Sequence, residues 1–131
     1  MYDFPEYPNP CFPQVEVDLK RTFPDDPFYS EEKVQTSLKN ILMAYIKRNP
    51  TIGYCQGMNF VAGRLLKVLE EEEAFWVLCQ LLESILPLDY YSNMVGVLVD
   101  QKIFFELIKT KMSDLHRHLD NIKLDLNLIA F

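Results

Sequence analysis

Apolar residues recur at intervals of three and four along much of this chain, which is the spacing that gathers them on one face of a helix. The clearest stripe predicts a helix over residues 31–47, with Ser30 as its N-cap and two glutamates in its first turn. Asn49 precedes Pro50, and a residue before proline is pushed out of the helical region. We therefore expect this helix to end at Asn49.

Four later stripes predict further helices. They begin near Met58, at the acidic run 70–73, which we place in the first turn, near Val95, and after Ser113, which we expect to be the N-cap of the last helix. Pro87 is expected to end the second of them, and a polar aromatic loop at 89–93 follows it. No segment alternates between apolar and polar residues over a length that would support a sheet. The pattern therefore predicts an all-α protein.

The two ends of the chain depart from this pattern. Residues 1–13 contain four prolines, which remove the backbone donors that a helix needs, so we predict a Pro-rich extended arm there. Residues 15–21 fit either a short strand or one helical turn. The last apolar run, 126–131, has no Gly or Pro stop, so we expect the chain to end within an element.

Composition narrows the functional classes. The chain has 131 residues, 49% of them hydrophobic, which suits one domain or a large part of one. Its formal net charge of -6 argues against broad binding to nucleic acid or anionic lipid. Neither a membrane-spanning run nor a signal peptide is recognisable, and we expect no direct membrane insertion and a cytoplasmic location.

Cofactor and metal motifs are missing from the sequence. Three cysteines share no ligand spacing, and we interpret them as reduced thiols. His116 and His118 are two residues apart and so point to different faces of a helix. Neither a GxGxxG nor a P-loop pattern occurs. We therefore expect no cofactor bound by this chain.

Two polar residues remain as candidates for chemistry. Arg21 follows Val15-x-x-Asp18 at a spacing of three from Asp18 and precedes Thr-Phe-Pro, while Gln56 lies at a loop-to-helix junction between Gly53 and Gly57. An arginine can neutralise charge that develops on a phosphoryl group in transfer, and a glutamine can orient an attacking water. Together they supply what phosphoryl transfer to water requires besides a metal ion.

Two neighbours are suited to support these candidates. Asp18 would restrain the Arg21 side chain, and Tyr54 would pack or hydrogen-bond beside the junction. Taken singly, Arg21 is also typical of an ordinary surface cation, and Gln56 of a residue beside an N-cap. The joint occurrence of the two favours a functional interpretation.

At these residues the sequence resembles the TBC domain, the catalytic module of Rab GTPase-activating proteins. Its IxxDxxR motif matches Val15 to Arg21, with Val in place of Ile, and its YxQ motif matches Tyr54 to Gln56. The second match extends over RNPTIGYCQGMN, residues 48–59, which adds Asn59 as a supporting residue. Further likeness runs through Ala74-Phe75-Trp76 and Asp100-Gln101.

The resemblance implies a helical domain and a dual-finger mechanism. Arg21 would be the arginine finger, and Gln56 would stand in for the glutamine of the partner's own switch region. GTP and magnesium would be bound by the partner, a Rab-family small GTPase. The protein would then regulate membrane traffic, recruited to endomembranes by its partner.

The family usually continues beyond the point where this sequence ends. We therefore expect residues 14–131 to be the N-terminal part of a TBC domain, truncated at its C-terminus. The apolar run 124–131 would lack a packing partner and favour self-association. The alternative function is a non-catalytic Rab-binding or helical scaffold module, and a plain interaction domain without a GTPase connection is a third.

Overall fold

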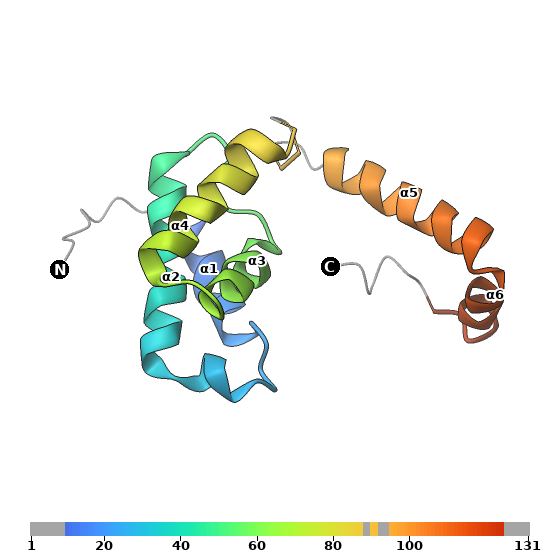
Figure 1. The fold of residues 1–131 in the computed structure, drawn as a ribbon, viewed down its shortest axis with the longest axis horizontal. Coiled ribbons are helices and arrows are strands. Elements are labelled where there is room, and N and C mark those ends of the chain that lie inside the picture. The colour runs from blue at the N-terminus through green and yellow to red at the C-terminus, as the bar shows by residue number, and fades with distance from the viewer. Residues whose placement is uncertain (1–9, 88–89, 92–94, 125–131) are drawn as a thin grey trace. The chain divides into compact units, whose positions relative to one another are not determined.

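The computed structural model describes residues 10–87, 90–91 and 95–124, and its described part contains helices but no strand. Their order is α1 (Phe12–Lys20), a 3₁₀ turn η1 (Pro27–Ser30), α2 (Glu32–Arg48), α3 (Met58–Leu66), α4 (Glu71–Gln80), a π-helical segment η2 (Leu81–Ile85), α5 (Val95–Lys111) and α6 (Ser113–Asn121) (Figure 1). The prediction of an all-α protein is confirmed. The chain divides into two compact units, residues 1–85 and 86–131.

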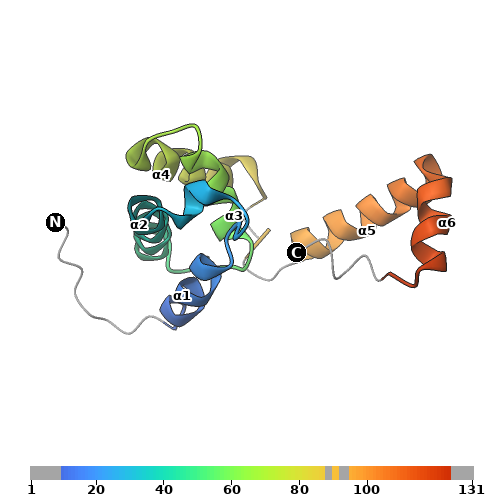
Figure 2. The same ribbon diagram turned by 90° about the horizontal axis from the view of Figure 1, so that it is seen from below.

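Helix α2 is the centre of the first unit. Its predicted stripe is buried and consists of Val34, Leu38, Ile41, Leu42, Tyr45 and Ile46. Helices α1, α3 and α4 all pack against α2, and α3 also packs against α4 (Figures 1 and 2). Burial of these side chains is the main favourable contribution to the stability of the unit. Asn49 ends α2, as predicted.

Three boundaries differ from the prediction. Helix α1 begins at Phe12, so the extended arm does not include residues 12 and 13. Pro13 lies in the first turn, where a helix tolerates proline because the missing N–H would have no intrahelical partner. Residues 15–21, left open between strand and turn, belong to this helix and its C-cap.

The second correction concerns Ser30, which does not cap α2. It is the last residue of η1, and Glu31 takes the N-cap position without a side-chain hydrogen bond. Asp26 instead caps η1, where its carboxylate accepts from the Phe28 amide at 3.2 Å. The third is that Ser113 is the first residue of α6, whose N-cap is Met112.

The second unit contains α5 and α6, which pack against each other. Ile108 is the buried residue of α5, and no residue of α6 is buried. The predicted arm over residues 1–9, part of the loop 89–93, and the apolar run after Leu124 lie outside the described residues. Within the described part, no helix is both long and apolar enough to span a membrane.

Candidate functional site

Asp18 is the centre of a buried polar network in the first unit. Its side chain is completely buried on α1, although a carboxylate rarely leaves water without partners. The Oδ1 atom lies 2.5 Å from Arg21 Nη2 and accepts from Gln14 Nε2 at 2.9 Å. The Oδ2 atom accepts from the Tyr54 hydroxyl at 2.6 Å. Both carboxylate oxygens are therefore satisfied.

Arg21 lies directly after α1, and Asp18 holds one side of its guanidinium group. Its spacing of three from Asp18 brings the two side chains onto neighbouring positions, as the sequence predicted. The guanidinium side chain is 48% exposed, so it keeps donors that face solvent while Asp18 restrains it. This arrangement presents a fixed cation at the surface.

Tyr54 joins the glutamine loop to α1. Burial, together with the hydrogen bond to Asp18, raises the pKa of Tyr54 above its ordinary value, so the hydroxyl stays protonated and remains a donor. The same hydroxyl lies 3.2 Å from Asn59 Oδ1. A loop residue separated by 36 positions from Asp18 is thereby anchored to the helix that precedes Arg21.

Asn59 connects the loop to α3, in whose first turn it lies. It is 1% exposed, and its Oδ1 atom accepts from the Gly57 amide at 3.2 Å. Gly57 has φ of 101° and Gly53 has φ of 64°, conformations that other residues rarely adopt. These two backbone conformations, one on each side of Gln56, shape the loop that carries it.

Gln56 lies between these anchors, after Tyr54 and Cys55 and before Gly57, and its side chain is exposed. Within the described residues Arg21 and Gln56 share no direct hydrogen bond. The network therefore brings together Asp18, Arg21, Tyr54 and Asn59, and it fixes the backbone on both sides of Gln56.

Residues to which the sequence assigned no role complete the site. Thr22 is 2% exposed and hydrogen-bonds to Asp18 and Asn59. Phe23 has φ of 47°, and its ring contacts Tyr29 and Phe60 with centroid distances of 4.8 and 5.2 Å. The Arg64 guanidinium lies 4.1 Å from the Phe23 centroid. These contacts hold a strained backbone next to Arg21.

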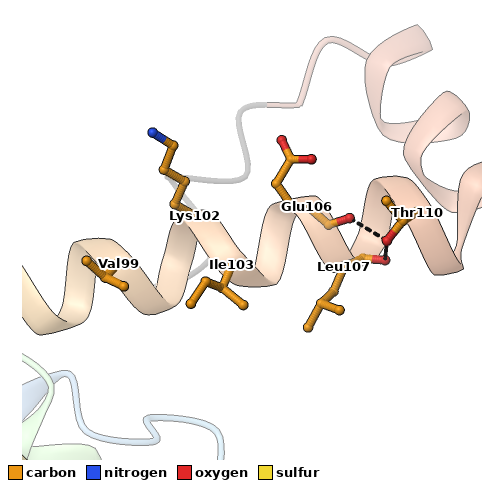
Figure 3. Close-up of a pocket in the computed structure, with 6 residues that line it drawn as sticks. All are labelled: Val99, Lys102, Ile103, Glu106, Leu107 and Thr110. Carbon is orange, nitrogen blue, oxygen red and sulfur yellow. Dashed lines mark hydrogen bonds between the residues drawn. The ribbon is translucent and has the colours of Figure 1, made fainter.

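Other parts of the described chain offer less chemistry. No cluster of three or more His, Cys, Asp or Glu side chains suited to a metal ion occurs among the described residues. A pocket of about 300 Å³ lies along α5 in the second unit (Figure 3). It is lined by Val99, Lys102, Ile103, Glu106, Leu107 and Thr110. All of these lie on a single helix, and none belongs to the network around Asp18.

Comparison with known proteins agrees with the family resemblance seen in the sequence. A family model described as the Rab-GTPase-TBC domain matches residues 3–131. TBC1 domain family member 2B of Homo sapiens is 43% identical over 130 residues, which cover 96% of this chain and 13% of that protein. TBC1 domain family member 2A of Homo sapiens is 42% identical over 127 residues, covering 94% of this chain and 14% of that protein. The chain thus spans about a seventh of these relatives' length.

Proposed function

The chain belongs to the Rab-GTPase-TBC domain family of Rab GTPase-activating proteins, and we propose that it stimulates GTP hydrolysis by a Rab-family small GTPase with two residues supplied in trans. Arg21 is the proposed arginine finger, and Gln56 is the proposed water-positioning residue. The observation that carries the proposal is the buried network that fixes Arg21 and the backbone beside Gln56 while leaving both side chains exposed.

Arg21 is suited to stabilise charge on the transferring phosphoryl group. Its guanidinium is always protonated, and Asp18 restrains part of it while other donors face solvent. A side chain held in this way loses less conformational freedom on reaching the phosphoryl oxygens. Because charge grows on these oxygens in the transition state, the interaction lowers the barrier more than it strengthens binding.

Gln56 is suited to orient the attacking water. Its amide oxygen can accept one proton of the water while its NH₂ group donates to a neighbouring oxygen. The neighbouring residues are held through Tyr54 and Gly57, so the exposed amide extends from a fixed stretch of backbone.

The GTPase supplies the remaining parts of the reaction. GTP and magnesium belong to the partner, and this chain contributes charge stabilisation and positioning. On this proposal the protein acts from the cytoplasm, on endomembranes to which its partner brings it.

Single-turnover GTP hydrolysis tests the proposal. A panel of Rab-family GTPases is assayed with this chain and with a chimaera in which the chain replaces the matching segment of human TBC1 domain family member 2B. An arginine finger contributes about 10³- to 10⁵-fold in rate. We expect stimulation that is lost in Arg21→Ala and in Gln56→Ala.

Two exposed residues near the ends of helices serve as controls. Lys20→Ala removes a neighbouring cation, and Gln80→Ala removes an exposed amide on α4, so both variants should retain the stimulation. Failure of both the chain and the chimaera on every GTPase would contradict the proposal and favour a non-catalytic binding module. Retained stimulation in Arg21→Ala would contradict the assignment of the finger.

A further inference from the structure

Thr22 lies at the point where α1 and the glutamine loop are joined. Its side chain is 2% exposed, and its hydroxyl has a partner on each side. The hydroxyl donates its proton to the Asp18 carbonyl oxygen at 2.7 Å and accepts from Asn59 Nδ2 at 2.8 Å. The first bond closes the last turn of the helix immediately before Arg21.

The second bond fixes the orientation of the Asn59 amide together with the Gly57 amide and the Tyr54 hydroxyl, both of which contact Oδ1. An amide has a donor end and an acceptor end, and the acceptor on Thr22 requires that the NH₂ group face it. The Oδ1 atom then faces the Gly57 amide, from which it accepts at 3.2 Å. Without the Thr22 acceptor, the Asp18 carbonyl oxygen at 3.5 Å is the remaining partner for Nδ2. A rotated amide would place its NH₂ group against the Gly57 N–H, where two donors meet.

Gly57 is the last residue on this hydrogen-bonded path. A Cβ atom built on Gly57 would meet no atom within 4 Å, so the space beside its Cα is open. Its φ of 101° is one of several conformations that glycine adopts with little strain. Its carbonyl oxygen accepts from the Phe60 and Val61 amides at the start of α3, while its own amide donates to Asn59, so the bond to Asn59 is the one that holds the side of Gly57 facing Gln56.

We propose that Thr22 is a positioning residue that sets the placement of Gln56 relative to Arg21. The path runs from the last turn of α1 through the Thr22 hydroxyl and the Asn59 amide to the Gly57 amide. Its effect on rate rests on the proposed function, whereas its effect on the loop does not. Misplacement of a catalytic group by about 1 Å can reduce the rate by about 10²-fold.

Two substitutions distinguish the effect of the Thr22 hydroxyl from the effect of its methyl group. Thr22→Val keeps the size and both branches but removes the hydroxyl, whereas Thr22→Ser keeps the hydroxyl and removes the methyl group that packs near Gly63. Both variants are expected to lose some thermal stability. A merely structural role would make their kinetic effects follow that loss of stability.

The kinetic test compares kcat and KM for GTPase stimulation in the chimaera described above. We expect Thr22→Val to lower kcat about 10-fold or more, with KM for the GTPase changed less than about twofold, and Thr22→Ser to keep kcat near that of the parent. A kcat for Thr22→Val within about threefold of that for Thr22→Ser would overturn the proposal.

A second readout does not require GTPase stimulation. Hydrogen exchange of the Gly57 amide is followed by NMR in the parent chain, Thr22→Val and Thr22→Ser. Faster exchange in Thr22→Val alone supports the positioning role even if the parent stimulates no GTPase, which would then count against the proposed function only. Equal exchange in the two variants would overturn the positioning role itself.

Discussion

The first unit buries sixteen of the seventeen apolar residues that are buried in the described chain, whereas the second unit buries Ile108. The second unit instead exposes most of the large apolar side chains found at the surface. These are Val95, Leu98, Val99, Ile103, Phe104, Leu107, Met112, Leu115, Ile122 and Leu124. Both units therefore consist of helices with apolar stripes, but these stripes are buried in the first unit and largely exposed in the second.

The difference shows which part of the chain can hold a site in position. In the first unit, a packed core surrounds the buried Asp18 network, so each polar group there has a fixed partner. In the second unit, the exposed apolar face of α5 is typical of a surface that packs against something else. We expect substitutions in the two units to have correspondingly different costs.

The largest difference is expected for leucines on the two long helices. Leu38 on α2 is fully buried, so Leu38→Ala should cost about 2–5 kcal/mol of unfolding free energy. Leu98 on α5 is 57% exposed, and Leu98→Ala should change stability by less than about 0.5 kcal/mol. Urea unfolding of both variants measures this. A comparable cost at Leu98 would show that α5 is buried in solution.

A smaller but still large effect is expected for the two carboxylates on α1. Asp18→Asn keeps the shape but weakens the bond to Arg21 and should cost about 2–3 kcal/mol, because Asp18 is completely buried. Glu16 pairs with Lys39 at the surface, with both side chains about half exposed, and Glu16→Gln should cost less than about 1 kcal/mol. Equal costs would mean that the network does not stabilise the unit.

The closeness of packing beside the site predicts the next effect. A Cβ atom on Gly63 would approach Phe23, Tyr29 and Thr22 at 3.2 to 3.3 Å. Because the two rings pack on each other, they have little room to move, and Gly63→Ala should cost about 1–3 kcal/mol despite better helix propensity. Thermal unfolding would measure it, and a stabilised variant would show that the site region is less tightly packed than described.

The smallest effect compares two buried tyrosines. The Tyr45 hydroxyl has no hydrogen bond of normal geometry among the described residues, although Asn49 lies near it, so Tyr45→Phe should be neutral or stabilise by up to about 1 kcal/mol. The Tyr29 hydroxyl donates to the Gly63 carbonyl oxygen at 2.9 Å, and Tyr29→Phe should cost about 1 kcal/mol. Denaturant midpoints of both variants test this order, and the reverse order would contradict it.

Tyr45 also predicts a pH dependence. Burial raises the pKa of Tyr45 to about 12, above its unfolded value of about 10. The protonated form therefore contributes stability that is fully present below about pH 10 and is lost as pH rises toward about 12. Tyr45→Phe should lose less stability over this interval than the parent. An identical decline in both proteins would show that Tyr45 does not contribute.

The sequence predicted the helices better than their boundaries or their contacts. The stripe in residues 31–47 was sufficient for α2, because a period of 3.6 residues specifies both the helix and its buried face. The start of α1 was missed because Pro13 occupies a position where proline is tolerated. Ser30 was misassigned because it is the last residue of η1, which precedes α2.

In the site, too, a contact between residues close in the sequence could be predicted, whereas a contact between distant residues could not. The pairing of Asp18 with Arg21 is local and could be predicted from their spacing. Thr22 was overlooked because its partner Asn59 is 37 residues away, and no local pattern reports such a pair. The stripe in α5 predicted a helix correctly, but a periodic pattern does not identify what its apolar face packs against.

The central claim is tested most directly by measuring how tightly the chimaera binds a GDP-loaded Rab-family GTPase with and without aluminium fluoride. The same affinities are measured for its Arg21→Ala, Gln56→Ala and Lys20→Ala variants. Transition-state analogues bind at least about 10²-fold more tightly than ground states when an enzyme stabilises the transition state. We predict that aluminium fluoride strengthens binding by that factor in the parent and in Lys20→Ala, and that this gain is lost in Arg21→Ala and Gln56→Ala. Equal affinity with and without aluminium fluoride, for a GTPase that the chimaera binds, would contradict the account.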